Sequence, residues 1–265
     1  MVINTNLSAI NAWRALETNN TNTQKALQKL SSGYRINSAA DDAAGLAISE
    51  KMKAQIAGLN QAQRNAQDGI SLLQTAEGAL NETHSILQRM RELVVQAGNG
   101  TNSDTDLDNI GKEITALQNE ITRIANQTQF NGKNLLDGTV SSITFQVGAN
   151  SDQVIGLSLT KMDAASLTVD ASSVSVYNDT DASSVSTMLG LIDDAINAVI
   201  VQRGEFGALQ NRLEHTINNL GTASENLTAA ESRIRDVDMA QEMMEFTKDN
   251  ILNQAATAML EEIAA

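Results

Sequence analysis

Few side chains in this chain could carry out catalysis or hold a metal ion. It contains no cysteine, and His84 and His215 are its two histidines. Thiol nucleophiles, disulfides and histidine-rich metal centres are therefore excluded. The two histidines could face each other across a helix pair and respond to pH, but separate histidines are the favoured interpretation. No metalloprotease motif and no glycine-rich phosphate loop is present, so we expect no enzyme activity, no metal and no cofactor.

Two acidic clusters have the spacing of a binding site but fit another role better. The run Asp104-Thr105-Asp106-Leu107-Asp108 resembles the opening of a calcium loop. Asparagine and threonine, however, stand where that loop needs glycine and glutamate. The run is typical of a helix N-terminus with Ser103 as its N-cap, where acidic side chains favour the positive end of the helix. The Asp41-Asp42 pair likewise predicts a cap before a long helix rather than a catalytic carboxylate dyad.

Two seven-residue repeats are the main structural signal. Each run has an apolar residue at every seventh position: Met52, Leu59, Ala66, Leu73, Leu80, Leu87 and Val94, then Ile192, Val199, Phe206, Leu213, Leu220, Leu227 and Ile234. Sustained heptads predict coiled-coil packing. The chain has no proline to interrupt its helices. A helix over 42–97 would be about 80 Å long, and an amphipathic helix after Ser103 should fold back along it.

The segment 131–188 has a different character. Asn131-Gly132 and Asp137-Gly138 are turn signals. Apolar residues alternate with polar ones, which is typical of short strands, at Ile143, Phe145, Val147, Ile155, Leu157 and Leu159. Val174 and Val176 indicate one further strand. We therefore predict a small β-rich insertion between two helical arms.

The predicted fold class is mostly α: an elongated, coiled-coil-like helical rod formed by both chain ends, with a small β-rich insertion in the middle. The expected organisation is an N-terminal amphipathic helix in 1–40, a long helix, turn and return helix in 41–130, the β-rich segment in 131–188, a C-terminal long helix in 189–238 and a terminal helix in 239–265. Gly33 should end the first helix.

Both terminal helices are amphipathic, and neither has a large partner within the chain except the other. Apolar stripes of this kind usually pack against a second chain. The residues that we expect to support such self-assembly are Ile3, Leu7, Ile10, Leu27, Leu30, Phe246, Ile251, Leu252 and Met259.

Charge and hydropathy exclude several other partners. The net charge is −14, and no basic stripe is present, which argues against nucleic acid and anionic membranes. No uninterrupted apolar run of 18 residues occurs, so we expect no membrane insertion. The N-terminus lacks the basic and apolar regions of a cleavable secretory signal.

The chain resembles bacterial flagellin over about four fifths of its length. The resemblance is carried by LSSGYRINSAADDAAGLAISEKM (30–52), by 68–100, by QTQFNGKNLLDG (127–138), by GALQNRLEHTINNL (207–220) and by 225–243. It implies a structural subunit that is exported unfolded through the flagellar type III channel and secreted. It also implies polymerisation into the extracellular flagellar filament, with the cap, hook-associated proteins and an export chaperone as further partners. Terminal helices form the inner tube of such filaments.

The resemblance further implies recognition of the monomer by Toll-like receptor 5 of animal hosts. The residues that match the receptor-binding region are Gln88, Arg89, Leu93, Gln96 and Glu113. Members of the family usually continue beyond Leu260 with a glutamine-rich stretch ending in Leu-Leu-Arg, whereas this chain reads Glu-Glu-Ile-Ala-Ala, so we expect a shortened or altered terminal helix. Two alternatives remain open: a hook–filament junction protein, and a secreted, non-polymerising flagellin-like immune ligand or adhesin.

Overall fold

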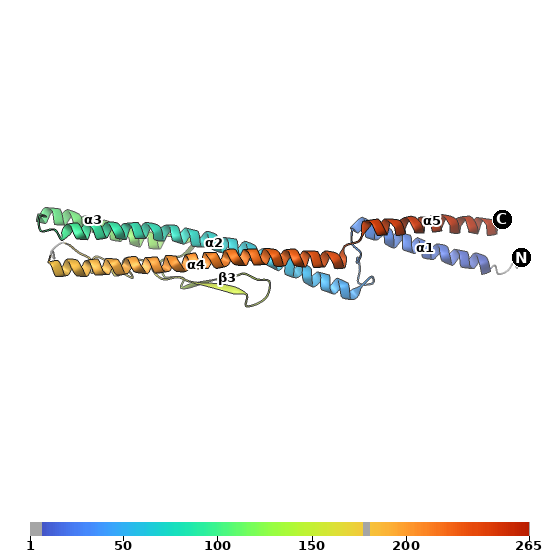
Figure 1. Ribbon diagram of the computed structural model, residues 1–265, viewed down its shortest axis with the longest axis horizontal. Coiled ribbons are helices and arrows are strands. Elements are labelled where there is room, and N and C mark those ends of the chain that lie inside the picture. Colours follow the sequence, from blue (N-terminus) through green and yellow to red (C-terminus); the bar gives the residue numbers. More distant parts are fainter. Residues whose placement is uncertain (1–6, 177–180, 265) are drawn as a thin grey trace. The chain divides into compact units, whose positions relative to one another are not determined.

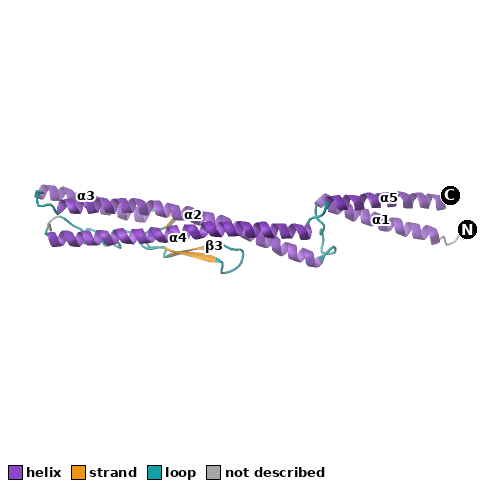
Figure 2. Ribbon diagram, in the orientation of Figure 1, coloured by secondary structure: helices purple, strands orange, loops and turns teal. Residues whose placement is uncertain are grey.

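The computed structural model describes residues 7–176 and 181–264, which form two compact units (Figure 1). The terminal unit draws on 1–57 and 223–265, and the central unit is 58–222. The helices in the described ranges are α1 (Leu7–Ser32), α2 (Ala43–Ala97), α3 (Asp104–Gln127), α4 (Ala182–Arg235) and α5 (Met239–Ala264). The strands are β1 (Gln129–Phe130), β2 (Lys133–Asn134), β3 (Ser142–Gln146) and β4 (Val154–Ser158) (Figure 2). The expectation of a mostly α fold with a small strand insertion is confirmed.

The two heptad runs form the core of the central unit. Here α2 and α4 lie antiparallel, as the ion pairs Arg91–Asp193 and Glu77–Arg203 show. The heptad residues of this unit that are buried are Ala66, Leu73, Leu80, Leu87, Val94, Ile192, Val199, Phe206, Leu213 and Leu220. Continuous burial at this spacing confirms the predicted coiled-coil packing.

Both predicted caps are confirmed. The Ser103 side chain and the Asp106 backbone and carboxylate form a reciprocal capping box at the start of α3. The Ser103 hydroxyl donates to the Asp106 carboxylate and thereby lowers the pKa of that carboxyl. The backbone N–H of Gly45 donates to Asp42 Oδ1 at 2.9 Å, which caps α2. The run from Asp104 is thus a helix N-terminus rather than a calcium loop.

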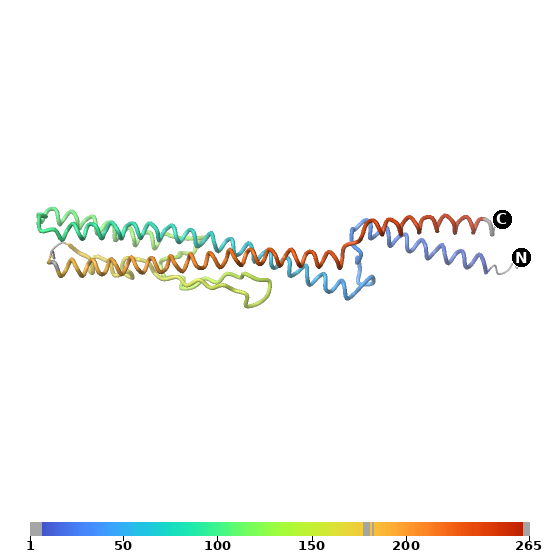
Figure 3. The backbone as a smooth tube through the Cα atoms, in the orientation of Figure 1, coloured from blue at the N-terminus to red at the C-terminus, as the bar shows by residue number. Residues whose placement is uncertain are grey.

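The β3–β4 hairpin packs against the helices of the central unit through one face. Its antiparallel register pairs Phe145 with Ile155. The Cβ of a larger residue at Gly69 would lie 3.1 Å from the Phe145 ring, so glycine allows the hairpin to approach α2 closely. The Asn65 amide of α2 donates to the Gln146 carbonyl, and the Gln202 amide of α4 donates to the Ser158 carbonyl. Side chains from two helices therefore hold the two strands. The backbone path of the hairpin beside α4 can be followed in Figure 3.

The segment after the hairpin differs from the sequence prediction. Val174 and Val176 do not form a strand; both are buried in the core as part of an irregular segment. The buried Gln118 amide of α3 donates to the Val174 carbonyl at 3.0 Å, which satisfies a backbone group that strand pairing would otherwise satisfy. Helix α4 begins at Ala182, ahead of the predicted residue 189.

In the terminal unit, α1 and α5 form an antiparallel pair (Figure 1). The ion pair Lys29–Glu242 and the hydrogen bond from Asn253 to Thr23 set their direction. The side chains that turn inward follow a three-four spacing on each helix, and we call them the terminal seam. They are Ala9, Ala12, Leu16, Asn19, Thr23, Ala26 and Leu30 of α1, with Glu242, Phe246, Asp249, Asn253, Ala256 and Leu260 of α5. This seam is small and polar compared with the core of the central unit.

The turn after α1 is anchored to the end of α4 within the terminal unit. Gly33 has a φ of +74°, which ends α1 as predicted. Tyr34 forms a β-bridge with Asp236. The Arg235 guanidinium lies 4.7 Å and the Lys53 ammonium 5.2 Å from the centre of the Tyr34 ring. These cation–π contacts and the bridge hold the turn after α1 in place against the last turns of α4.

One helix among the described residues, Ser183–Arg235, is long and apolar enough to cross a bilayer by length and composition alone. Its apolar residues include Ile192, Val199 and Phe206, which are buried in the core of the central unit. Asp193 of the same helix is ion-paired with Arg91. Packing within the protein therefore accounts for part of the hydropathy of this helix, whereas Ile200 and Val201 remain exposed.

The two units should differ in local stability. Ala26 and Ala256 are the only buried hydrophobic residues of α1 and α5 among the side chains described there, whereas large side chains fill the central core. Amide hydrogen exchange of the monomer should therefore be faster in α1 and α5 than in 73–94 of α2, by on the order of a hundredfold. Mass spectrometry of peptides after timed exchange measures this ratio. Equal protection in both units would contradict the weak terminal seam.

Candidate functional site

An exposed polar surface lies on α2 and α3, and we call it the Arg89 surface: Gln88, Arg89, Glu92, Gln96 and Glu113. Arg89 Nη2 is 2.9 Å from Glu113 Oε1, and Arg89 Nη1 is 3.1 Å from Glu92 Oε2. The hydrogen bond from Arg89 to Glu113 raises the pKa of the guanidinium, and the bond to Glu92 adds to the effect. All five side chains are exposed. The surface thus presents a charged planar group that two carboxylates hold in place.

Leu93, which the sequence grouped with these residues, lies beside Arg89 and Gln96 on α2 but is buried in the core. Its side chain is 1% exposed and belongs to the core of the central unit. It cannot contribute an exposed contact while that core is intact. Leu93 therefore marks the edge at which the Arg89 surface meets the core, one helical turn from both Arg89 and Gln96.

The two histidines occupy different environments. His84 is half-buried on α2, and its Nε2 atom lies 3.0 Å from Gln88 Nε2, on the same helix. His215 is exposed on α4. This arrangement fits the interpretation of separate histidines. In the described ranges, no group of three or more histidine, aspartate or glutamate side chains has a geometry that could hold a metal ion.

The expected assembly residues of the terminal helices divide into two sets. Leu30 and Phe246 are half-buried in the terminal seam. The others that the structure describes point away from it and are exposed: Leu7 at 69%, Ile10 at 40%, Leu27 at 56%, Ile251 at 61%, Leu252 at 43% and Met259 at 63%. Ile3 lies outside the described residues. The large apolar side chains are therefore mostly free rather than paired between α1 and α5.

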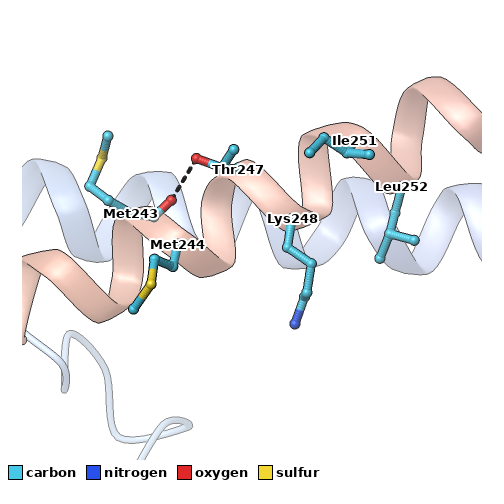
Figure 4. Close-up of a pocket in the computed structure, with 6 residues that line it drawn as sticks. All are labelled: Met243, Met244, Thr247, Lys248, Ile251 and Leu252. Atoms are coloured by element: carbon cyan, nitrogen blue, oxygen red, sulfur yellow. Dashed lines mark hydrogen bonds between the residues drawn. The ribbon is translucent and has the colours of Figure 1, made fainter.

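The structure adds residues that the sequence reasoning did not select. Trp13 is 58% exposed and continues the row of Leu7 and Ile10 on α1. On α5, Met243 and Met244 join Thr247, Lys248, Ile251 and Leu252 around a shallow groove (Figure 4). The three-residue spacing of the α1 row was a signal that could have identified Trp13. We call the exposed apolar residues of α1 and α5 together the apolar terminal face.

Comparison with known proteins decides the family. The profile of the bacterial flagellin N-terminal helical region matches residues 3–141, and that of the C-terminal helical region matches residues 189–264. The chain belongs to the bacterial flagellin family. It is accordingly a structural subunit of the flagellar filament, an extracellular assembly.

Individual flagellins agree over almost the whole chain. The flagellin of Halalkalibacterium halodurans is 58% identical over 260 residues, covering 98% of this chain and 94% of that protein. The flagellin of Bacillus subtilis (strain 168) is 54% identical over 289 residues, covering 98% and 95%. The flagellar filament 33 kDa core protein of Treponema phagedenis is 49% identical over 271 residues, with the same coverage.

Solved structures share the fold. The crystal structure of Bacillus cereus flagellin has a TM-score of 0.53 and 38% identity, covering 63% of this chain and 94% of that chain. A putative flagellar hook-associated protein from Vibrio parahaemolyticus has a TM-score of 0.60 at 18% identity, covering 74% and 100%. The second likeness concerns the fold alone.

Burial separates the roles of two neighbouring flagellin residues. Leu93→Ala should lower the free energy of unfolding by about 2–5 kcal/mol, because it leaves a cavity in the core. Arg89→Ala should leave the melting temperature almost unchanged, because exposed ion pairs contribute little to stability. Thermal unfolding followed by circular dichroism distinguishes the two. A large destabilisation by Arg89→Ala would overturn the assignment of Arg89 to a free surface.

Proposed function

We propose that this flagellin assembles into the filament by burying the apolar terminal face between copies of the chain. The observation that carries the proposal is that the side chains of α1 and α5 fall into two sets, one paired within the monomer and one exposed. Most of the side chains that pair within the monomer are small or polar, and most of the large apolar ones stay exposed. Burial of a large apolar side chain contributes about 1.5–3 kcal/mol. Several such residues on two helices supply enough free energy to hold subunits together.

The composition supports export of an unfolded chain. We infer passage through the flagellar type III channel and secretion, because a chain without cysteine cannot be locked by a disulfide. A chain without proline also avoids slow isomerisation when it refolds at the filament tip. The exposed α5 groove would need cover before export, which suits an export chaperone. The cap and hook-associated proteins are the further expected partners at the ends of the filament.

The Arg89 surface supports a second function, recognition of the monomer by Toll-like receptor 5. Its exposed Arg89 guanidinium is held in place by an ion pair with Glu113 and has glutamines beside it. Arginine often serves as an anchor in protein interfaces. Four residues of the surface, Gln88, Arg89, Gln96 and Glu113, also match the family's receptor-binding region. Leu93 matches that region too, but its side chain is buried. Because the same helix face is a subunit contact in flagellin filaments, we expect the monomer rather than the filament to signal.

Neither alternative has an equal basis. A hook–filament junction protein is favoured only by the likeness in fold to the Vibrio protein, at 18% identity. A non-polymerising ligand or adhesin would have no use for the apolar terminal face. An enzyme would need catalytic side chains that the sequence does not offer.

Assembly can be tested by polar substitutions that leave the monomer intact. The double variant Ile251→Ser, Met259→Ser should raise the critical concentration for polymerisation by more than about tenfold, because it removes apolar burial between subunits. Sedimentation and negative-stain microscopy after salting out measure the fraction in filaments. Both side chains are more than 60% exposed, so the helical content of the monomer should not change.

Gln254→Ser is the matched control. Gln254 is an exposed polar residue on the same helix, and its replacement removes no apolar contact. It should polymerise at the concentration of the unmodified chain. Normal filaments from the double variant would contradict the role of the apolar terminal face.

The receptor proposal is tested with folded monomer in a cell line that expresses Toll-like receptor 5. Arg89→Ala should reduce signalling potency by about tenfold or more, because it removes an interface anchor. Arg123→Ala is the control: Arg123 is an exposed arginine of α3, and it pairs with Glu120 on its own helix. Equal losses for the two variants, or equal potency of monomer and cross-linked filament, would count against the proposal.

A further inference from the structure

The methionines of this chain are distributed unevenly between core and surface. In the described ranges, Met90, Met162 and Met188 are buried and Met52 is half-buried. The exposed methionines of those ranges all belong to α5: Met239 at 48%, Met243 at 50%, Met244 at 68% and Met259 at 63%. We call these four the α5 methionines. They lie outside the terminal seam, which places their thioethers in solvent when the chain is monomeric.

Exposed thioethers react with peroxides. A methionine sulfur attacks hydrogen peroxide, the O–O bond breaks, an S–O bond forms and the second oxygen leaves as water. The sulfur loses two electrons and becomes a sulfoxide, and the peroxide is reduced by two electrons. The chain has no cysteine, so no thiol competes for the oxidant. Susceptibility then follows exposure, which favours the α5 methionines over those of the core.

We propose that the α5 methionines form a reversible oxidation site through which peroxide blocks assembly of the chain. The assembly half of this inference rests on the proposed role of the apolar terminal face. Met243 and Met244 line the α5 groove together with Ile251 and Leu252, and their side chains extend away from the helix (Figure 4). A sulfoxide there makes an apolar contact surface polar, and burying that polar group between subunits costs free energy.

Oxidation at this site should spare the monomer. The contacts that hold α5 against α1 are made by other residues of the helix: Glu242 pairs with Lys29, and Asn253 donates to Thr23. None of the four thioethers takes part in these contacts. Sulfoxide formation therefore changes the surface offered to a second copy and leaves the helix pair in place. Once subunits cover the face, the same thioethers are shielded from oxidant.

The test begins with the full chain as a monomer. Samples treated with hydrogen peroxide are digested, and the sulfoxide at each methionine is followed by mass spectrometry. The α5 methionines should oxidise about tenfold faster than Met90, Met162 and Met188. The critical concentration for polymerisation should rise by about tenfold or more, with unchanged far-ultraviolet circular dichroism. Treatment with methionine sulfoxide reductases A and B should return the methionine-containing peptides to their unoxidised masses and should restore assembly.

Variants assign the effect to this site. Each is compared with its own untreated sample, so that a change in basal assembly does not matter. Replacing all four α5 methionines by leucine keeps the apolar volume. Peroxide should then change the critical concentration for polymerisation of this variant less than about twofold, whereas that of the unmodified chain should change about tenfold. Met52→Leu, outside the site, should keep the full sensitivity.

The outcomes separate the two proposals. Equal oxidation rates in core and α5, normal assembly of fully oxidised chain, or failure of reductases to restore assembly would each overturn the oxidation site. If the untreated chain does not polymerise, the proposed function fails and the assembly half of this inference falls with it. The site-resolved oxidation rates still decide in that case whether the modification site itself exists.

Discussion

The structure depends on burial of one apolar seam, the heptad contact of α2 with α4 in the central unit. Leu80, Leu87 and Phe206 are almost fully excluded from solvent there, and each contributes free energy through the area that it removes from water. Every other feature of that unit is attached to this contact. The return helix α3 covers it, and the β3–β4 hairpin is held against it by amide side chains of α2 and α4.

The terminal seam follows the same spacing with different chemistry, and the difference has a function. Alanine, asparagine, threonine and two carboxylates occupy most of its inner positions, and the large apolar residues among them are only half-buried: Leu16, Leu30, Phe246 and Leu260. Such a seam sets the direction of α1 against α5 but contributes little free energy. The large apolar side chains remain outside, where a second copy can bury them. Under the proposed assembly, weak pairing in the monomer and strong pairing between subunits are two consequences of one distribution of residues.

Local patterns were sufficient for much of the fold. The long helix, the caps at Asp42 and Ser103 and the stop at Gly33 depend on residues within a few positions of one another, so they could be predicted. Predictions that depended on distant partners were less successful. Val174 lies in an irregular segment because Gln118, remote in sequence, satisfies its carbonyl. Leu93 was grouped by resemblance with the receptor-matching residues; the structure buries it in the core of the central unit, and its role at the receptor stays a prediction.

The sequence by itself determined the family, the helical class and the heptad period, because these are carried by residue types at fixed spacing. It also predicted that both terminal helices are amphipathic, which holds for α1 but is wrong for α5, whose apolar side chains are spread around the helix. Only the tertiary structure decided which of the two stripes on α1 is paired. The stripe of Leu7 and Ile10 is the more apolar, but the stripe containing Ala12 and Ala26 faces α5. That choice depends on how closely a distant helix can approach, since small side chains permit close contact, and no local pattern specifies it.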